Sequence, residues 1–178
     1  MEKKDLKPAG VFKYFEEICQ VPRPSKKEEK MIAYLKAFGA KHNLETKVDE
    51  AGNVLIKKPA TPGKENLQTV VLQSHIDMVC EKNNDVQHDF LTDPIETEID
   101  GEWLKAKGTT LGADNGIGVA TELAILADDS IEHGPLECLF TVDEETGLTG
   151  AFALKEGFMS GDILLNLDSE DEGEIFIG

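Results

Sequence analysis

A short segment, residues 74–79, contains the first residues of this chain whose types and spacing could do chemistry. The sequence Ser-His-Ile-Asp-Met-Val follows a continuous apolar run at 70–72, which is typical of a buried strand. His75 and Asp77 are two apart, so in an extended exit from that strand they point to the same side. The imidazole could then bind a metal while the carboxylate orients the ring. A buried histidine with an ordinary hydrogen bond fits the same pair, so the pair needs support from elsewhere in the chain.

That support comes from carboxylates at other predicted strand ends and helix starts. Glu144 and Glu145 follow an apolar run at 136–142, Asp168 follows a run at 163–167, and Asp114 lies in the glycine-flanked segment 111–116. Any one of them could be a surface residue, and Asp114 could cap the helix that follows it. Open α/β sheets, however, bring the carboxyl ends of their strands together at the functional site. We therefore expect these side chains to converge with the histidine on a metal site.

The residue types indicate which metal chemistry to expect. Histidine and carboxylates without thiolates suit zinc or manganese at a hydrolytic centre better than a structural zinc. A pair of metals needs a bridging carboxylate, and an additional carboxylate can act as a base. Glu144 and Glu145 could divide the roles of ligand and base. Cys19, Cys80 and Cys138 have no C-x-x-C spacing, which argues against a thiolate site and for a reducing compartment.

Composition narrows the class of protein. The chain has 178 residues, of which 40% are hydrophobic and 30% charged, as expected for one globular domain. Its 18 basic and 35 acidic residues give a net charge of −17, which disfavours nucleic acids and anionic membranes as partners. No apolar stretch is long enough to span a bilayer, and the first residues do not form a signal peptide. We therefore expect a cytoplasmic protein.

The hydrophobic pattern predicts an α/β fold, a mixed β-sheet flanked by helices. Helices are expected over 8–20 and after a capping box formed by Ser25 and Glu28, and then over 118–127 with a short one after 145. Residues 80–94 are expected to form a long irregular loop. Strands are expected in hairpins at 44–56 and 95–105, and at 70–73, 136–142 and 163–167. Residues 175–177 are expected to begin a further element.

Four strings in this order closely resemble the aminoacyl-histidine dipeptidases. They are S-H-I-D-M-V, G-T-T-L-G-A-D-N-G-I-G, D-E-E-T-G and L-N-L-D-S-E-D-E-G-E-I. Those enzymes belong to the dinuclear zinc exopeptidases, which include carnosinases and aminoacylases. The likeness runs from the first helix to Gly178, and K-N-N-D, H-D-F and D-G-E-W-L-K-A-K-G are specific to the dipeptidase branch.

The resemblance implies a metal centre with defined ligands. Asp114 would bridge two zinc ions, with cobalt or manganese as alternatives. His75 and Asp168 would complete the coordination of one metal, and Glu145 would bind the other. The resemblance also implies a cis peptide between Asp114 and Asn115.

It implies catalytic roles as well. Glu144 would be the general base, and Asp77 would orient the histidine ligand. The substrate would be an aminoacyl-histidine dipeptide, hydrolysed to a free amino acid and histidine by a metal-activated water.

The chain also departs from the family pattern. The family's second metal needs a histidine far down the chain, and a separate lid domain grips the substrate. The other histidines here are His42, His88 and His133, which we expect at the surface or in local hydrogen bonds. We therefore expect residues 1–178 to be the N-terminal part of a metallopeptidase catalytic domain, without the lid domain and the C-terminal part.

Such a fragment should have one nearly complete metal site, formed by His75, Asp114 and Asp168, and should be inactive alone. It should also expose an apolar sheet edge that favours a homo-oligomer. Two alternatives remain open. One is a different dinuclear zinc hydrolase, such as a deacylase, tripeptidase or aminopeptidase. The other is a non-catalytic acidic module that binds cations.

Overall fold

A mixed five-stranded sheet forms the centre of the molecule. The computed structural model describes residues 3–169 and 173–177. The strand order is β1-β2-β6-β3-β7, in which β1, β2 and β6 pair antiparallel while β3 lies parallel to both β6 and β7. This arrangement confirms the predicted fold class. The strands are β1 (Glu45–Val48), β2 (Val54–Lys58), β3 (Val70–His75), β6 (Leu136–Thr141) and β7 (Ile163–Asn166).

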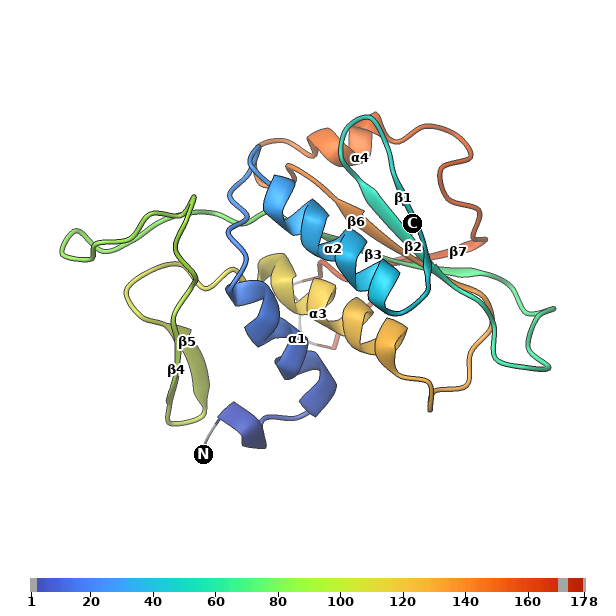
Figure 1. Cartoon of the computed structure of the whole chain (residues 1–178), viewed down its shortest axis with the longest axis horizontal. Helices are drawn as coiled ribbons and strands as arrows, with labels where there is room; N and C mark the ends of the chain where they lie inside the picture. Colours follow the sequence, from blue (N-terminus) through green and yellow to red (C-terminus); the bar gives the residue numbers. More distant parts are fainter. Residues whose placement is uncertain (1–2, 170–172, 178) are drawn as a thin grey trace.

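Helices cover the sheet unevenly. In Figure 1, α1 and α3 lie below the strands and α4 lies above them. Helix α1 ends close to where the apolar spacing predicted and α2 follows it as expected, but α3 begins before the predicted start at residue 118. The helices are η1 (Lys3–Asp5), α1 (Ala9–Cys19), α2 (Glu29–Lys41), α3 (Ala113–Ala127) and α4 (Thr149–Ala153). No helix of the described residues is long and apolar enough to cross a membrane.

Side-chain alternation along the strands divides the core between the two faces of the sheet. Val54 and Ile56 of β2 join the main cluster with residues of α1, α2 and α3. Leu55, between them, points to the other face and packs with Phe158 and Met159. The larger cluster therefore holds the three long helices, and the segment after α4 covers the second face.

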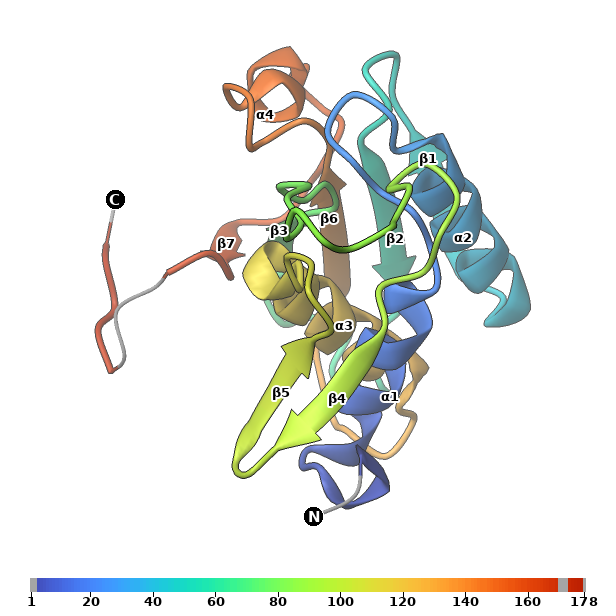
Figure 2. The same ribbon diagram turned by 90° about the vertical axis from the view of Figure 1, so that its left-hand side faces the viewer.

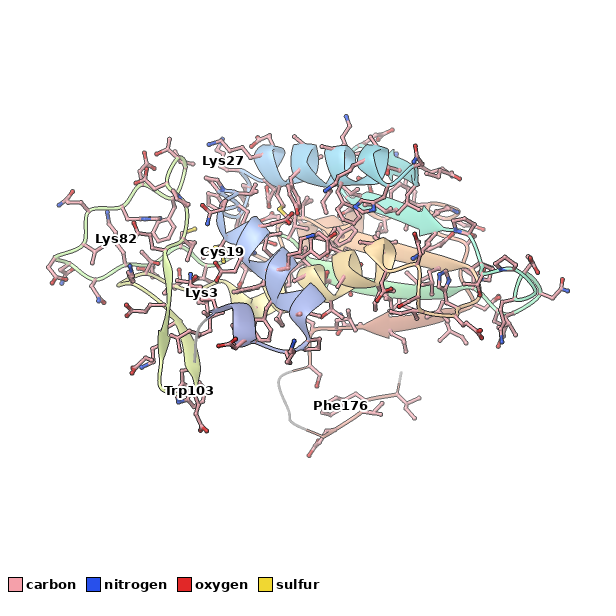
Figure 3. The ribbon with its side chains drawn as sticks, turned by 60° about the horizontal axis from the view of Figure 1, so that its bottom comes forward. Lys3, Cys19, Lys27, Lys82, Trp103 and Phe176 are labelled. Carbon is pink, nitrogen blue, oxygen red and sulfur yellow. The ribbon has the colours of Figure 1, made fainter. Side chains whose placement is uncertain are left out.

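A separate hairpin projects from the body of the molecule. It consists of β4 (Thr97–Asp100) and β5 (Trp103–Ala106), paired as the Asp100-Gly101 turn signal predicted. Figure 2 shows it apart from the main sheet, and Figure 3 shows Trp103 at its end. Residues 80–94 form no helix or strand, in agreement with the predicted loop.

Two predictions about local structure are wrong. Ser25 and Glu28 do not form a capping box, because the Ser25 hydroxyl donates to the Asp77 carboxylate and Glu28 Oε1 accepts from the backbone N–H groups of Lys26 and Asp143. Residues 175–177 form no helix or strand. Figure 3 shows Phe176 on a segment away from the body, apart from the strands of the described residues.

Candidate metal centre

His75 lies at the end of β3, beside the end of β6, and four carboxylates from other parts of the chain surround it. Its side chain is 1% exposed, and Nδ1 lies 3.3 Å from Asp77 Oδ1. The other ring nitrogen, Nε2, lies 3.0 Å from Asp114 Oδ1 and 3.8 Å from both Glu144 Oε2 and Asp168 Oδ1. The structure thus brings these predicted site residues together, from the three strand exits and the start of α3.

Asp77 links the exits of the two central strands. Its fully buried carboxylate accepts hydrogen bonds from the backbone N–H groups of Glu144 at 3.0 Å and Glu145 at 3.2 Å. The hydroxyl of Ser25 donates to the same carboxylate at 2.7 Å. One side chain therefore faces the histidine ring and also fixes the turn that carries both glutamates. Such a partner orients a metal-binding histidine and raises its basicity.

Asn115 holds the start of α3 against the end of β7, a role that the sequence did not reveal. Its side chain is 2% exposed, and its amide donates to the carbonyl oxygen of Leu167 at 3.0 Å and to the carboxylate of Asp168. The peptide bond between Asp114 and Asn115 is cis, as the resemblance implied. The signal in the sequence was an asparagine directly after a candidate ligand.

The electrostatics couple the ring to its neighbours. Burial alone would lower the pKa of His75, but the adjacent carboxylates of Asp77 and Asp114 outweigh it and raise the pKa to about 9. Burial would raise the pKa of Asp77, yet His75 and backbone N–H groups lower it to about 2. Burial is also the main cause of the raised pKa values of Glu144 and Asp168. The protonated ring therefore favours the ionised form of Asp77, whereas burial outweighs its effect on Glu144 and Asp168 and favours their protonated forms.

Two overlapping groups of side chains could hold a metal ion. One joins His75 with Asp114 and Asp168, and the other joins it with Glu144 and Glu145; within each group the ligand atoms lie within 4.8 Å of one another. An imidazole with several carboxylates, and no thiolate in these groups, is a donor set for zinc or manganese. The residues therefore fit a divalent metal.

A third group of acidic residues has a structural role. Glu28, Asp77 and Asp143 are buried and close enough to share an ion. Their oxygens, however, accept hydrogen bonds from backbone N–H groups and from the hydroxyls of Ser25 and Thr146. These bonds hold the turn after β6 in place.

The other histidines lie away from these groups. The ring of His42 packs on Phe38, and that of His88 packs on Phe90. His133 Nδ1 lies 2.7 Å from the carbonyl oxygen of Gly134. Their contacts are local, as predicted, and none of the three belongs to a candidate metal group of the described residues.

Comparison with known proteins identifies the family. The sequence pattern of peptidase family M20/M25/M40 matches residues 71–173, the span that contains all of the candidate ligands. The chain belongs to this family. Membership in peptidase family M20/M25/M40 confirms the family predicted from the four sequence strings and fits a hydrolase acting on peptide bonds.

Relatives within this peptidase family share the fold closely. The chain is 52% identical over 99% of its length to the cytosol non-specific dipeptidase of Escherichia coli, of which it covers 36%. The structure of the aminoacylhistidine dipeptidase of Vibrio alginolyticus matches 97% of this chain with 56% identity and a TM-score of 0.94. The aminopeptidase PepT of Bacillus cereus matches 91% with 26% identity and a TM-score of 0.77.

The matches differ in how much of each relative they include. The chain covers 35% of the Vibrio alginolyticus dipeptidase and 43% of the Bacillus cereus aminopeptidase. It thus spans about a third of the length of the two dipeptidases, so it corresponds to one part of each of them.

Proposed function

We propose that this chain is the N-terminal part of a metal-dependent dipeptidase that hydrolyses aminoacyl-histidine dipeptides. The observation that carries the proposal is the meeting of His75 with four carboxylates from the carboxyl ends of three strands and the start of α3. Both relatives above 50% identity are named dipeptidases, which supports a dipeptide substrate, and the name of the Vibrio alginolyticus enzyme supports aminoacyl-histidine dipeptides. The cytosolic name of one of them supports a cytoplasmic location.

We assign the metal ligands from the two groups around the histidine. His75, Asp114 and Asp168 form the first group and would hold one zinc. Glu145, from the second group, would bind a second metal, to which Asp114 would also contribute. Cobalt or manganese could replace zinc, since the same donors suit them. The second site would need one further ligand, from the part of the relatives that this chain does not cover. The lid domain, which would grip the substrate, would also come from that part. We therefore expect the isolated chain to hold about one zinc and to be inactive.

Glu144 serves as the general base in this proposal. Its side chain is 28% exposed, its Oε2 lies 3.8 Å from His75 Nε2, and its pKa is raised, chiefly by burial. A raised pKa suits a carboxylate that accepts a proton from water and passes it to the leaving amine. Asp77 keeps the histidine ring and the Glu144 backbone in a fixed relation. A bound divalent metal would polarise the scissile carbonyl and acidify the attacking water.

The test combines metal content with hydrolysis. Zinc per chain, measured by elemental analysis after dialysis, should be about one for the unaltered chain and for Glu144→Gln, because this substitution leaves the first ligand group intact. His75→Ala should lose the zinc. In a protein extended to the length of the relatives, Glu144→Gln should reduce hydrolysis of aminoacyl-histidine dipeptides by about 10²–10⁴-fold.

Other outcomes would redirect the proposal. If calcium or magnesium bound as tightly as zinc and Glu144→Gln left hydrolysis unchanged, the acidic cation-binding module would be correct. The likeness to an aminopeptidase at 26% identity favours a second candidate, a tripeptidase or aminopeptidase. A substrate panel with and without a carboxyl-terminal histidine separates the two enzymes.

A further inference from the structure

Arg23 lies in the connection between α1 and α2, and its side chain reaches the segments that carry His75 and Asp114. Its side chain is buried, with 2% exposure. One nitrogen, Nη1, donates to the carbonyl oxygens of Ile76 at 3.1 Å and Asp77 at 3.0 Å. The other, Nη2, donates to the carbonyl oxygen of Gly112. One guanidinium thus joins the exit of β3 to the segment that leads into α3.

A buried guanidinium bonded to carbonyl oxygens needs an explanation, because removing a charge from water is costly. Neighbouring carboxylates offset part of this cost, among them Asp77 and Glu145. The three carbonyl groups it binds also gain a partner inside the protein, where an unpaired carbonyl would be destabilising. The buried Arg23 guanidinium can therefore stay charged at the point where the two site-bearing segments approach each other.

The start of α3 is shaped around this side chain. A Cβ atom added to Gly112 would lie 2.5 Å from Arg23 Nη2, and one added to Gly116 would lie 2.7 Å from the same nitrogen. Both distances are shorter than Cβ atoms tolerate. Two glycines, on either side of Asp114, therefore leave the space that the guanidinium occupies.

The same connection also reaches the turn after β6. The hydroxyl of Ser25 donates to the Asp77 carboxylate, and Glu28 accepts from the backbone N–H of Asp143. The stretch from Arg23 to Glu28 therefore contacts all the segments that carry His75, Asp114 and Glu144.

We propose that Arg23 is a positioning residue that sets the spacing between the His75–Asp77 segment and Asp114, and so holds the candidate ligands in one group. The planar guanidinium has five N–H donors in a fixed geometry and reaches carbonyls on both sides. A lysine ammonium is a compact point charge and cannot span the same acceptors. The spacing follows from the contacts alone, and its consequence for metal binding rests on the proposed function.

Lys58 provides a matched control. It is 7% exposed and donates to the carbonyl oxygens of Ile125 at 3.1 Å and Asp128 at 2.7 Å, at the far end of α3. It is therefore a second buried cation bonded to backbone carbonyls, away from the site. Loss of either side chain removes hydrogen bonds to backbone carbonyls, so both substitutions should lower the melting temperature.

The experiment compares Arg23→Lys, Arg23→Met and Lys58→Met in the chain as it stands. Zinc affinity is measured by competition with a chelator, and hydrogen exchange of the metal-free chain reports on the backbone. Both Arg23 variants should bind zinc about 10–100-fold more weakly, the usual loss when a partner of a ligand is removed. Amides at 76–78 and 112–116 should exchange faster. Lys58→Met should leave the zinc affinity within about twofold of that of the unaltered chain, because substitutions at distant sites act independently.

Unchanged exchange at 76–78 and 112–116 in Arg23→Lys would overturn the inference, and so would an equal loss of zinc affinity in Lys58→Met. If Arg23→Met does not fold, Arg23→Lys still decides. If the unaltered chain binds no zinc, the proposed function fails, but hydrogen exchange still tests the spacing.

Added guanidinium should restore zinc binding to Arg23→Ala and have no such effect on Lys58→Ala.

Discussion

Glu122 is a fully buried carboxyl group on α3 that the proposed reaction does not use. The hydroxyl of Ser74, next to His75, donates to its Oε1 at 2.6 Å, while Oε2 has no hydrogen-bond partner. Burial raises its pKa well above 4.5, with only partial opposition from Ser74 and Cys138. The group therefore stays protonated in the folded chain at a pH where it ionises in the unfolded chain.

Glu122→Gln should stabilise the chain, and the gain should grow with pH. A raised pKa in the folded state gives stability that is complete below the unfolded pKa of 4.5 and is lost as pH rises toward the folded value. Glutamine keeps the acceptor for Ser74 and does not ionise. Unfolding by denaturant at about pH 5 and about pH 8 measures the difference, and each unit of raised pKa contributes about 1.4 kcal/mol. A gain that is the same at both pH values would contradict this reading.

At the scale of elements, β7 is an edge strand whose apolar side chains are about half exposed. It pairs with β3 on one side, and its other edge ends the sheet. Its residues Ile163, Leu164 and Leu165 are 39%, 48% and 48% exposed. Figure 2 shows the C-terminal segment running away from this strand. Parallel strands are normally buried on both faces, so the exposure confirms the predicted apolar edge and favours pairing with another strand.

We therefore expect the isolated chain to self-associate through β7. A Leu164→Lys, Leu165→Lys double substitution places charge on both faces of the edge and should shift the chain toward monomer in light scattering. Leu91→Lys is the control, because Leu91 is 54% exposed and lies in the 80–94 loop. A monodisperse monomer for the unaltered chain would rule out this association.

For the whole molecule, charge governs the behaviour of the site. The net charge is −17, and four carboxylates approach one histidine. Repulsion among them opposes folding when no cation is bound, and a bound cation removes that repulsion. Metal binding and folding should therefore be linked.

Removing zinc with a chelator should lower the melting temperature. Zinc at about 100 times its dissociation constant should add about 2.7 kcal/mol, which corresponds to about 5–10 °C for a chain of this size. Calorimetry with and without zinc measures the shift, and added salt should restore part of it in the metal-free chain. His75→Ala should show no zinc-dependent shift. Equal melting temperatures with and without zinc would mean that the site does not assemble in this chain.

The sequence predicted most elements and the residues at their ends. Alternation and helical spacing depend on neighbouring residues, so β2, β3, β6 and α2 were readable without tertiary information. His75, Glu144 and Asp168 were selected because each follows an apolar run, and parallel strands bring such ends together. The assignment of roles to these residues came from the family resemblance and stays a proposal.

Only the tertiary structure decided what Arg23, Ser25 and Asn115 do. Ser25 had a local partner in the capping-box pattern, but the Asp77 carboxylate competes for its hydroxyl from a strand far along the chain. Arg23 and Asn115 bind backbone groups, and the sequence does not mark which carbonyl oxygens will lie beside a side chain. Local periodicity therefore determined the elements and the candidate ligands, whereas the long-range polar contacts that hold those ligands together arise only when the chain folds.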